Sequence, residues 1–337
     1  PTRDFDEILA FTQEHGFPVM LKAASGGGGK GMRIVHSEEE LRSVYQNAVN
    51  EANASFGDDR MYIEKYIKSA KHIEVQVLGD QHGHLIHLFE RDCSVQRRNQ
   101  KVIEIAPAIG LPFELRQQIC DAAVQLMSSL HYENAGTVEF LVEDNHFYFI
   151  EVNPRVQVEH TITELITDAD IVQSQLRVAD GADLFTDLHF PAQEDITFRG
   201  AAIQCRITTE DPANNFMPDT GTISTYRSPG GLGVRLDVGN AYAGAVVSPY
   251  FDSLLVKTSV HSASFGGAVR KMQRALREYR ITGVKTNLPF LKNVLDHPTF
   301  QAGAAETTFI DNTPELFKLR PVRSRSTELM NYVSEIT

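Results

Sequence analysis

Four consecutive glycines, Gly26–Gly29, lie between two short apolar segments near the start of the chain. The segments 18–22 (PVMLK) and 32–36 (MRIVH) are too short for helices and have the composition of strands. Glycine carries no Cβ, so its backbone can turn tightly and can approach a ligand closely. The pattern predicts a β-hairpin with an unusually bare tip.

Two well-known phosphate-binding loops are excluded by the residues of this hairpin. The glycine run satisfies the spacing G-x-G-x-x-G, but a dinucleotide-binding loop must lead into a helix, and a strand follows here. A P-loop would require glycine at Ala24 and serine or threonine at Gly31. We therefore expect the hairpin tip to offer backbone N–H groups to a phosphate, with Lys22 and Lys30 nearby. A surface hairpin without a ligand is the alternative.

The composition limits the classes of protein to consider. At about 150 residues per domain, 337 residues predict roughly two domains. Lys plus Arg is 32 against 44 for Asp plus Glu, and this charge of -12 argues against a general nucleic-acid binder. No apolar stretch approaches the ~18 residues of a membrane span, so we expect no membrane partner. Three scattered cysteines favour neither a disulfide framework nor a cysteine metal site, and they indicate a reducing, cytoplasmic location.

The first residues predict that the chain begins within a longer protein. Residues 2–15 have the apolar spacing of an amphipathic helix that ends at Gly16, and no charged or apolar leader segment precedes it. Further helices are expected over 37–52 and 113–131. The apolar face of the second is predicted to contain Leu115, Ile119, Ala123, Leu126 and Leu130.

Two central segments carry polar groups that could meet a ligand. Strict alternation over 72–78 predicts a strand with His72, Glu74 and Gln76 on one face, which meets either solvent or a ligand. Residues 91–101, after a predicted strand over 84–90, contain four cations, a density that suits a polyanion. Cys93 within this segment is expected to be a small buried residue rather than a nucleophile, because no histidine stands beside it.

A second hairpin predicts a metal site. Residues 136–142 and 147–153 have the pattern of two strands that turn through 144–146, and with Asn145 at the centre Glu139 lies directly opposite Glu151. Paired carboxylates are unfavourable in a sheet unless a cation lies between them. Asn153 projects from the same face, and two carboxylates with an amide oxygen are the hard ligands that Mg²⁺ or Mn²⁺ prefers. Two glutamates on a solvated face are the alternative.

The segment after this hairpin carries groups suited to an anion. The guanidinium of Arg155 matches a small planar oxyanion, Gln157 adds an amide, and Glu159 could act as a general base. These residues by themselves fit any small oxyanion.

Five segments together resemble the biotin carboxylase component of biotin-dependent carboxylases, an ATP-grasp enzyme. They are the glycine loop, 64–66 (EKY), 92–98 (DCSVQRR), 150–160 (IEVNPRVQVEH) and 230–235 (GGLGVR). The resemblance runs from residue 1 to about Leu316 and includes 248–257 (SPYFDSLLVK) and 281–287 (ITGVKTN). Residues 307–317 (TTFIDNTPELF) are most similar to the pyruvate carboxylase branch of that family, and the acyl-CoA carboxylases are the alternative.

The resemblance implies that ATP and bicarbonate form carboxyphosphate, which yields CO₂ to the ureido nitrogen of biotin on a carrier domain outside this chain. It implies that ATP phosphates are held by Lys22, Gly26, Gly27, Gly28, Gly29 and Lys101, and adenine and ribose by Glu64, Lys65, His72 and Gln96. It assigns Mg²⁺ or Mn²⁺ to Glu139, Glu151 and Asn153, and bicarbonate to Arg155, Gln157 and Val158. Glu159 would be the base and Arg235 would stabilise the biotin enolate. Asn99 departs from the histidine of several members.

The implied fold is α+β, with an ATP-grasp portion over 1–193 that has a mobile lid of about 1–66 and an antiparallel-sheet core of about 67–193. A biotin carboxylase C-terminal domain over 199–310 and a linker over 311–337 toward a carboxyltransferase domain follow. The family also has an N-terminal α/β domain with another ATP-binding lysine, so we expect these 337 residues alone to be weakly active or inactive. A catalytic part that forms a homo-oligomer is the first interpretation, and an inactive assembly fragment is the second.

Overall fold

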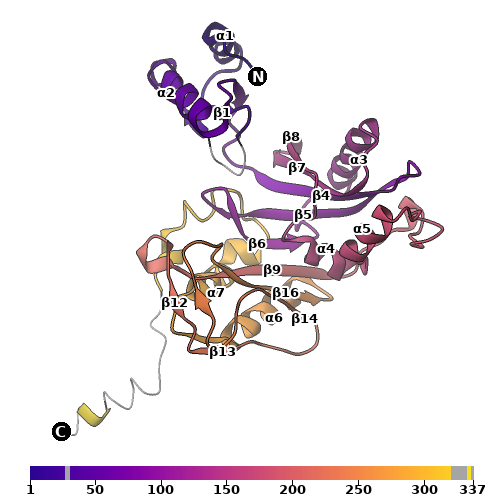
Figure 1. The fold of residues 1–337 in the computed structure, drawn as a ribbon, viewed down its shortest axis with the longest axis vertical. Coiled ribbons are helices and arrows are strands. Elements are labelled where there is room, and N and C mark those ends of the chain that lie inside the picture. Colours follow the sequence, from indigo (N-terminus) through magenta and orange to yellow (C-terminus); the bar gives the residue numbers. More distant parts are fainter. Residues whose placement is uncertain (27–30, 320–331, 335–337) are drawn as a thin grey trace.

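The structure is a computed structural model that describes residues 1–26, 31–319 and 332–334. Gly27, Gly28, Gly29 and Lys30, which the sequence assigns to phosphate binding, lie outside the described residues. Figure 1 shows a small N-terminal unit and a long twisted sheet, one end of which is formed by strands of a C-terminal unit, residues 201–319. Within the described ranges, no helix has the length and apolar character needed to cross a bilayer.

The N-terminal unit, called the lid below, consists of residues 1–66. It contains α1 (Phe5–His15), β1 (Val19–Ala23), β2 (Met32–Val35), α2 (Glu38–Phe56) and β3 (Met61–Lys65). Its sheet has the order β2-β1-β3, and Lys22 pairs with Met32 across the glycine run, so the predicted hairpin is confirmed. The helix predicted to end at Gly16 does so, with Gly16 at φ 73°.

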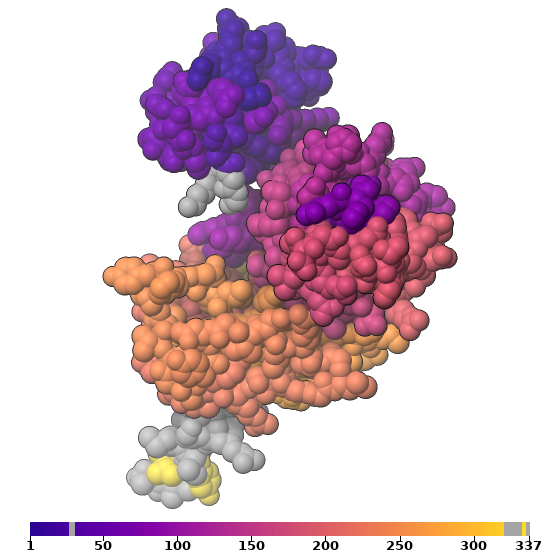
Figure 2. All heavy atoms as spheres, turned by 45° about the vertical axis from the view of Figure 1, so that its right-hand side comes forward, coloured from indigo at the N-terminus to yellow at the C-terminus, as the bar shows by residue number. Residues whose placement is uncertain are grey.

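The lid has its own hydrophobic core. Leu21 and Val35 of the hairpin pack with Ile8 of α1 and Leu41 of α2, and all four are fully buried. Figure 2 shows the lid, coloured from indigo to purple, standing above the rest of the molecule.

A single eight-stranded antiparallel sheet joins the remainder of the chain, in the order β14-β16-β9-β6-β5-β4-β7-β8. Its strands are β4 (Lys71–Gly79), β5 (Leu85–Arg97), β6 (Gln100–Ala106), β7 (Asn134–Glu143), β8 (His146–Asn153), β9 (Ala201–Thr208), β14 (Val234–Val238) and β16 (Leu254–Ser262). Because β9 pairs with β6, the two domains expected from the sequence contribute to one continuous sheet.

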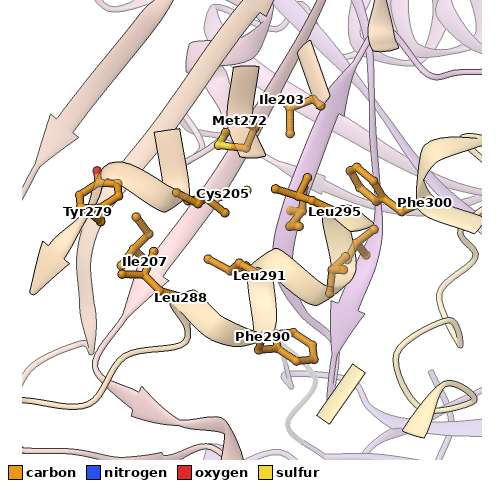
Figure 3. Packing of buried hydrophobic residues seen from close by; sticks show 14 of the residues in the cluster. Ile203, Cys205, Ile207, Met272, Tyr279, Leu288, Phe290, Leu291, Leu295 and Phe300 are labelled. Atoms are coloured by element: carbon orange, nitrogen blue, oxygen red, sulfur yellow. The ribbon is translucent and has the colours of Figure 1, made fainter. Parts of the chain in front are cut away.

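Helices cover both faces of this sheet. The face that carries Ile73 and Ile105 packs against α3 (Phe113–Ser129), α6 (Phe265–Glu278) and α7 (Leu288–Asp296). Figure 3 shows this packing in the C-terminal unit, where Ile203, Cys205 and Ile207 of β9 meet Met272 of α6 and Leu291 of α7. The predicted apolar face of α3 is correct except at its end, because α3 stops at Ser129 and Leu130 is 61% exposed.

Shorter elements complete the fold. The helices α4 (His160–Thr167) and α5 (Ile171–Ala179) follow β8, and α8 (Pro298–Gln301) follows α7. Three small two-stranded sheets pair β10 (Glu210–Asp211) with β11 (Met217–Pro218), β12 (Gly221–Thr222) with β15 (Val246–Val247), and β13 (Thr225–Arg227) with β17 (Arg280–Thr282). Single helical turns occupy η1 (Gln193–Asp195), η2 (Pro212–Asn214) and η3 (Pro314–Phe317).

The β7–β8 hairpin confirms the opposition of Glu139 and Glu151 but not the predicted turn. The turn is two residues long, Asp144 and Asn145 at φ 49° and 62°, and Glu143 pairs with His146. This register would place Glu139 opposite Ile150. A shift between Glu139 and Phe140 inserts one extra residue on β8, which moves Glu151 opposite Glu139.

Candidate active site

Polar residues form a row across the face of the large sheet that lies opposite α3, α6 and α7. At one end Arg235 of β14 pairs with Ser259, Ser259 with Gln204, and Gln204 with Glu104. At the other end Arg91 pairs with Glu74, Glu74 with Glu139, and Glu139 with Glu151. Side chains paired across antiparallel strands share a face, so the sheet itself gathers these groups.

The ammonium group of Lys101 lies at the centre of this row. Its Nζ donates to Glu139 Oε1 at 2.8 Å and to Glu159 Oε1 at 2.8 Å, and it also donates to Glu74. Burial opposes the charge, but the three carboxylates outweigh it and hold the pKa of Lys101 above its usual range. Burial likewise raises the pKa of Glu74, and Arg91 and Lys101 lower it further than burial raises it.

Glu139, Glu151 and Asn153, the predicted metal ligands, lie together. Asn153 Nδ2 donates to Glu139 Oε1 at 3.0 Å and to Glu151 Oε1 at 3.3 Å, so one atom reaches both carboxylates. Burial alone would raise the pKa of Glu139, but a hydrogen bond from His72 and the charge of Lys101 lower it on balance. The carboxylate left ionised by these neighbours has the charge and hard oxygen atoms that Mg²⁺ requires.

The amide of Asn153 is turned the wrong way for a metal ligand in this structure. Its nitrogen faces the two carboxylates, while its oxygen Oδ1 accepts from Arg155 Nη2 at 3.2 Å. An ion held between Glu139 and Glu151 would therefore bind Asn153 only after the amide rotates by about 180°.

Glu159 lies in the turn that precedes α4 and is 2% exposed. Its Oε1 accepts from Lys101, and its Oε2 accepts from Arg206 Nη2 of β9 at 2.9 Å. The neighbouring Val158 carbonyl accepts from Lys257 Nζ of β16 at 3.0 Å. The C-terminal unit thus supplies two cations that hold the segment predicted to bind an anion.

Arg155 and Gln157 both lie near the carboxylate cluster, but they differ in exposure to solvent. Arg155 is exposed and contacts Asn153, whereas Gln157 is 6% exposed and donates from Nε2 to Glu139 Oε1 at 3.0 Å. This segment does not extend β8. The chain leaves β8 at Asn153 and turns through Pro154–Glu159 into α4, which brings Gln157 and Glu159 back under the sheet.

His72 and Gln96 are hydrogen-bonded to each other and to the carboxylate cluster. Gln96 Nε2 donates to His72 Nδ1, which assigns the ring proton to Nε2, and Nε2 donates to Glu139 Oε2 at 2.7 Å. The alternation predicted over 72–78 is confirmed, but its polar face is fully enclosed rather than solvated.

The remaining predicted nucleotide residues lie in the lid. Lys22 of β1 forms an ion pair with Glu64 of β3, Lys65 is exposed at the end of β3, and Gly26 donates to the Ala23 carbonyl at 3.0 Å. Within the described part of the chain, no hydrogen bond or ion pair links these side chains to His72, Gln96 or Lys101. The structure therefore presents the predicted nucleotide ligands as a lid group and a sheet group.

Arg235 lies on β14, the edge strand opposite to β8 in the sheet order. Its Nη1 donates to Glu164 Oε2 of α4 at 2.6 Å, and its Nε and Nη2 donate to Asp237 at 3.1 Å. Asp237, Lys257 and four neighbouring residues line a cavity of about 260 Å³ beside it.

The segment 91–101 does not form one basic patch, contrary to the sequence prediction. β5 continues unbroken to Arg97, and the turn at Arg98 and Asn99 sends the chain back into β6. Arg91 and Lys101 point into the carboxylate cluster, whereas Arg97 and Arg98 hydrogen-bond Asn215 outside it. Cys93 is buried as expected, and burial raises the pKa of its thiol well above the usual value.

Sequence reasoning gave no role in the site to several members of the cluster: Glu74, Arg91, Glu104, Arg206 and Lys257. The alternation over 72–78 placed Glu74 on the face of His72, but it did not reveal the contacts of Glu74 with Arg91 and Lys101. The others depend on pairings between strands far apart in sequence, such as β6 with β9, which no local pattern reveals.

Comparisons with known proteins agree along the whole chain. The family described as "Carbamoyl-phosphate synthase L chain, ATP binding domain" matches residues 1–186, and "Biotin carboxylase C-terminal domain" matches residues 204–312. Pyruvate carboxylase of Staphylococcus aureus is 60% identical over 338 residues, and that of Bacillus subtilis is 56% identical. Each alignment covers 100% of this chain and 29% of the relative, so the chain spans under a third of these proteins.

Solved structures match with similar closeness. The biotin carboxylase domain dimer of Hydrogenobacter thermophilus 2-oxoglutarate carboxylase, in complex with MgADP, ADP and bicarbonate, has a TM-score of 0.89 and 45% identity. That match covers 94% of this chain and 68% of the solved one. Rhizobium etli pyruvate carboxylase with acetyl coenzyme A also has a TM-score of 0.89, at 50% identity, over 95% of this chain and 29% of that one.

Proposed function

The chain belongs to the biotin carboxylase family of ATP-grasp proteins, and on that premise we propose that it carboxylates biotin with ATP and bicarbonate through carboxyphosphate. The observation that carries this proposal is the position of Lys101. One partly buried ammonium group contacts Glu139, the proposed metal ligand, and Glu159, the proposed base, at 2.8 Å each. The ATP phosphate, the metal ion and the base that removes the proton would therefore all lie within reach of the Lys101 side chain.

Glu139, Glu151 and Asn153 would hold Mg²⁺, or Mn²⁺ in its place. Two carboxylates that one atom can reach, together with an amide oxygen, fit a hard divalent ion. The bound ion would neutralise charge on the ATP phosphates. Lys101 would then bind a phosphate oxygen, because its ammonium group already lies among the carboxylates that the ion would engage.

Arg155, Gln157 and Val158 would bind bicarbonate, and Glu159 would remove the bicarbonate proton. An oxygen of bicarbonate would then bond to the γ-phosphorus of ATP as ADP leaves. A base must lie within about 3 Å of the proton that it removes. Glu159 is in the turn that also contains Gln157 and Val158, which supports this assignment. Arg206 would keep Glu159 oriented while Lys101 engages phosphate.

Nucleotide would bind between the lid group and the sheet group. Lys22 and the glycine loop Gly26–Gly29 would contact the phosphates, and Glu64, Lys65, His72 and Gln96 would surround adenine and ribose. Support comes from the Lys22–Glu64 pair in the lid and the His72–Gln96 pair on the sheet. Arg235 would stabilise the biotin enolate, and its edge position beside a cavity supports access by a carrier-bound group.

The domain assignment also remains a proposal: a lid over about 1–66, a core over about 67–193, a C-terminal domain over 199–310 and a linker over 311–337. Within that linker, Leu316 is 1% exposed and packs against α7, so the linker would begin as a packed turn.

In the whole protein we infer the reaction of a pyruvate carboxylase, which converts pyruvate to oxaloacetate. The relatives named above support this choice over an acyl-CoA carboxylase. A biotinyl carrier domain, a carboxyltransferase domain and further copies of the chain would be partners, since the Hydrogenobacter domain is a dimer. Three buried, unpaired thiols support a reducing compartment such as the cytoplasm.

Carboxylation of free biotin tests the proposal. The full-length gene product should form ADP and acid-labile labelled carboxybiotin from MgATP, labelled bicarbonate and free biotin. Omission of any one substrate should abolish the carboxybiotin. ATP cleavage that ignores bicarbonate would contradict the proposal and would favour an unrelated phosphotransferase or an assembly role.

A further inference from the structure

Arg91 is a completely buried arginine at the middle of β5, and it lies beside the proposed bicarbonate site. The side chain is 0% exposed. Its guanidinium donates to acceptors from three segments of chain besides its neighbour strand: Glu74 and Gln76 of β4, Thr137 of β7, Gln157 of the turn and Thr163 of α4. Every nitrogen of the guanidinium is engaged.

Placing a charged guanidinium there is costly. Burial of an ion pair often contributes less to stability than well-packed apolar residues of the same volume. Glu74 is the only carboxylate hydrogen-bonded to Arg91 among the described residues, and four neutral acceptors complete its shell. A role in orienting those acceptors is a reason for such a residue to be present.

The contact with Gln157 has a direct geometric consequence. Arg91 Nη2 donates to Gln157 Oε1 at 3.0 Å, and Gln157 Nε2 donates to Glu139 Oε1 at 3.0 Å. An amide has one accepting end and one donating end, so a donor at Oε1 fixes which way the amide points. Arg91 therefore keeps the donating end of Gln157 directed into the site.

The contact with Glu74 ties Arg91 to a second group of the site. Glu74 Oε1 accepts from Arg91 Nε at 2.5 Å, and Glu74 Oε2 accepts from Lys101. One planar side chain thus spans the carboxylate that holds Lys101 and the amide proposed to bind bicarbonate. Lysine, with a single nitrogen, cannot span both acceptors.

We propose that Arg91 is a positioning residue for bicarbonate, acting through the orientation of the Gln157 amide. This inference rests on the proposed function, because it presumes that Gln157 contacts bicarbonate. It predicts an effect on bicarbonate that exceeds any effect on ATP, which a purely structural arginine would not produce.

Arg91→Lys in the full-length gene product is the primary test, read as steady-state bicarbonate-dependent ATP cleavage. The variant retains a cation for Glu74 but withdraws the donor from Gln157. We expect the KM for bicarbonate to rise about tenfold or more, while the KM for ATP changes by less than about twofold. Arg116→Lys is the matched control, because Arg116 is a mostly buried arginine paired with Glu90 on the other face of the sheet.

A double-mutant cycle with Gln157→Ala separates positioning from general damage. If Arg91 acts through Gln157, adding Arg91→Lys to Gln157→Ala should raise the KM for bicarbonate little further, because the orienting effect has already been lost. Equal, multiplicative effects in both backgrounds would overturn the proposal. So would a parallel rise in both KM values, or an unchanged KM for bicarbonate.

Thr163→Val decides the matter if Arg91→Lys does not fold. Thr163 Oγ1 accepts from Arg91 Nη1 at 2.9 Å and touches no predicted ligand. Loss of this hydroxyl should loosen the guanidinium and raise the KM for bicarbonate by a smaller factor than Arg91→Lys does. An unchanged KM for bicarbonate in Thr163→Val would overturn the proposal. Failure of the proposed function itself looks different, since the unaltered protein would then show no bicarbonate-dependent ATP cleavage at all.

Discussion

Three cations offset most, but not all, of the negative charge in the cluster around Lys101 when no ligand is bound. Arg91, Lys101 and Arg206 face Glu74, Glu104, Glu139 and Glu159, so carboxylates exceed cations by one. Glu104 is the carboxylate whose pKa is raised, first by its own burial and then by Glu159. Glu151, opposite Glu139, adds a fifth carboxylate and makes the excess two, which a divalent ion beside Glu139 and Glu151 would balance. Lys101 would then be free to bind phosphate.

Glu151→Gln tests the metal assignment. The substitution removes one of two charges that would face the ion, so the affinity for MgATP should fall by about tenfold or more. Titration calorimetry measures the affinity for MgATP. Glu143→Gln, on the same hairpin but outside the site, is the matched control and should bind MgATP as the unaltered protein does. Equal affinity in Glu151→Gln and Glu143→Gln would exclude Glu151 as a ligand.

Glu159→Gln tests the base. Glutamine keeps the shape and can still accept from Lys101 or Arg206 through its oxygen, but it cannot take a proton. We expect kcat to fall by about 10²-fold while the dissociation constant for MgATP stays within about threefold. A variant that lost nucleotide affinity instead would assign Glu159 a structural role.

His87, on β5 away from the cluster, makes a separate prediction about pH. Burial lowers the pKa of its imidazole to about 4, from an ordinary value of 6.5. Between these values the unfolded chain binds more protons than the folded one, so stability falls as the pH is lowered. Because of His87, the free energy of unfolding should fall by about 2 kcal/mol as the pH is lowered from 7 to 5. Denaturant unfolding of His87→Gln at both pH values should show a smaller pH dependence by that amount.

At the scale of elements, sequence patterns predicted most of what is local. The glycine hairpin, the alternation over β4 and most of the apolar face of α3 follow from residues near one another in the chain. The opposition of Glu139 and Glu151 was predicted with the wrong turn, because a tight turn and an extra residue on β8 offset each other. The pairing of residues along a hairpin depends on the length of its turn and on any extra residue in a strand, and the sequence pattern revealed neither.

What could not be predicted is the pairing of distant elements. The carboxylate cluster needs β6 beside β9 and the turn before α4 folded back beneath the sheet. Arg91 illustrates the limit: in sequence it was one of four cations in a basic run, whereas its chemistry is set by acceptors between 15 and 72 residues away. The family resemblance supplied the site residues on the motif strands but not the buried groups that hold them.

At the scale of the whole molecule, the lid and the large sheet have separate hydrophobic cores. Leu21 belongs to the lid core, while Ile203 on β9 lies in the core of the C-terminal unit. Because β6 and β9 are hydrogen-bonded neighbours, a change at Ile203 should spread into the ATP-grasp core. Loss of a fully buried branched side chain costs about 2 to 5 kcal/mol in either place.

Amide hydrogen exchange can compare the two substitutions. Leu21→Ala should accelerate exchange in β1, β2 and α2 and leave β4 to β7 unchanged. Ile203→Ala should accelerate exchange in β9 and also in its neighbour β6, with the lid unaffected. Acceleration of the lid by Ile203→Ala would show that the two cores unfold as one unit.

Oxygen tracing tests the central claim, that bicarbonate attacks ATP in this site, most directly. The full-length gene product would turn over MgATP with ¹⁸O-labelled bicarbonate in unlabelled water, and the released phosphate would be analysed by mass spectrometry. If carboxyphosphate forms, the oxygen that bonds to the γ-phosphorus stays there when CO₂ departs, so each phosphate should carry a bicarbonate oxygen. Phosphate whose one new oxygen comes from water, and which therefore carries no label, would mean that ATP is hydrolysed without carboxyphosphate, and would contradict the account.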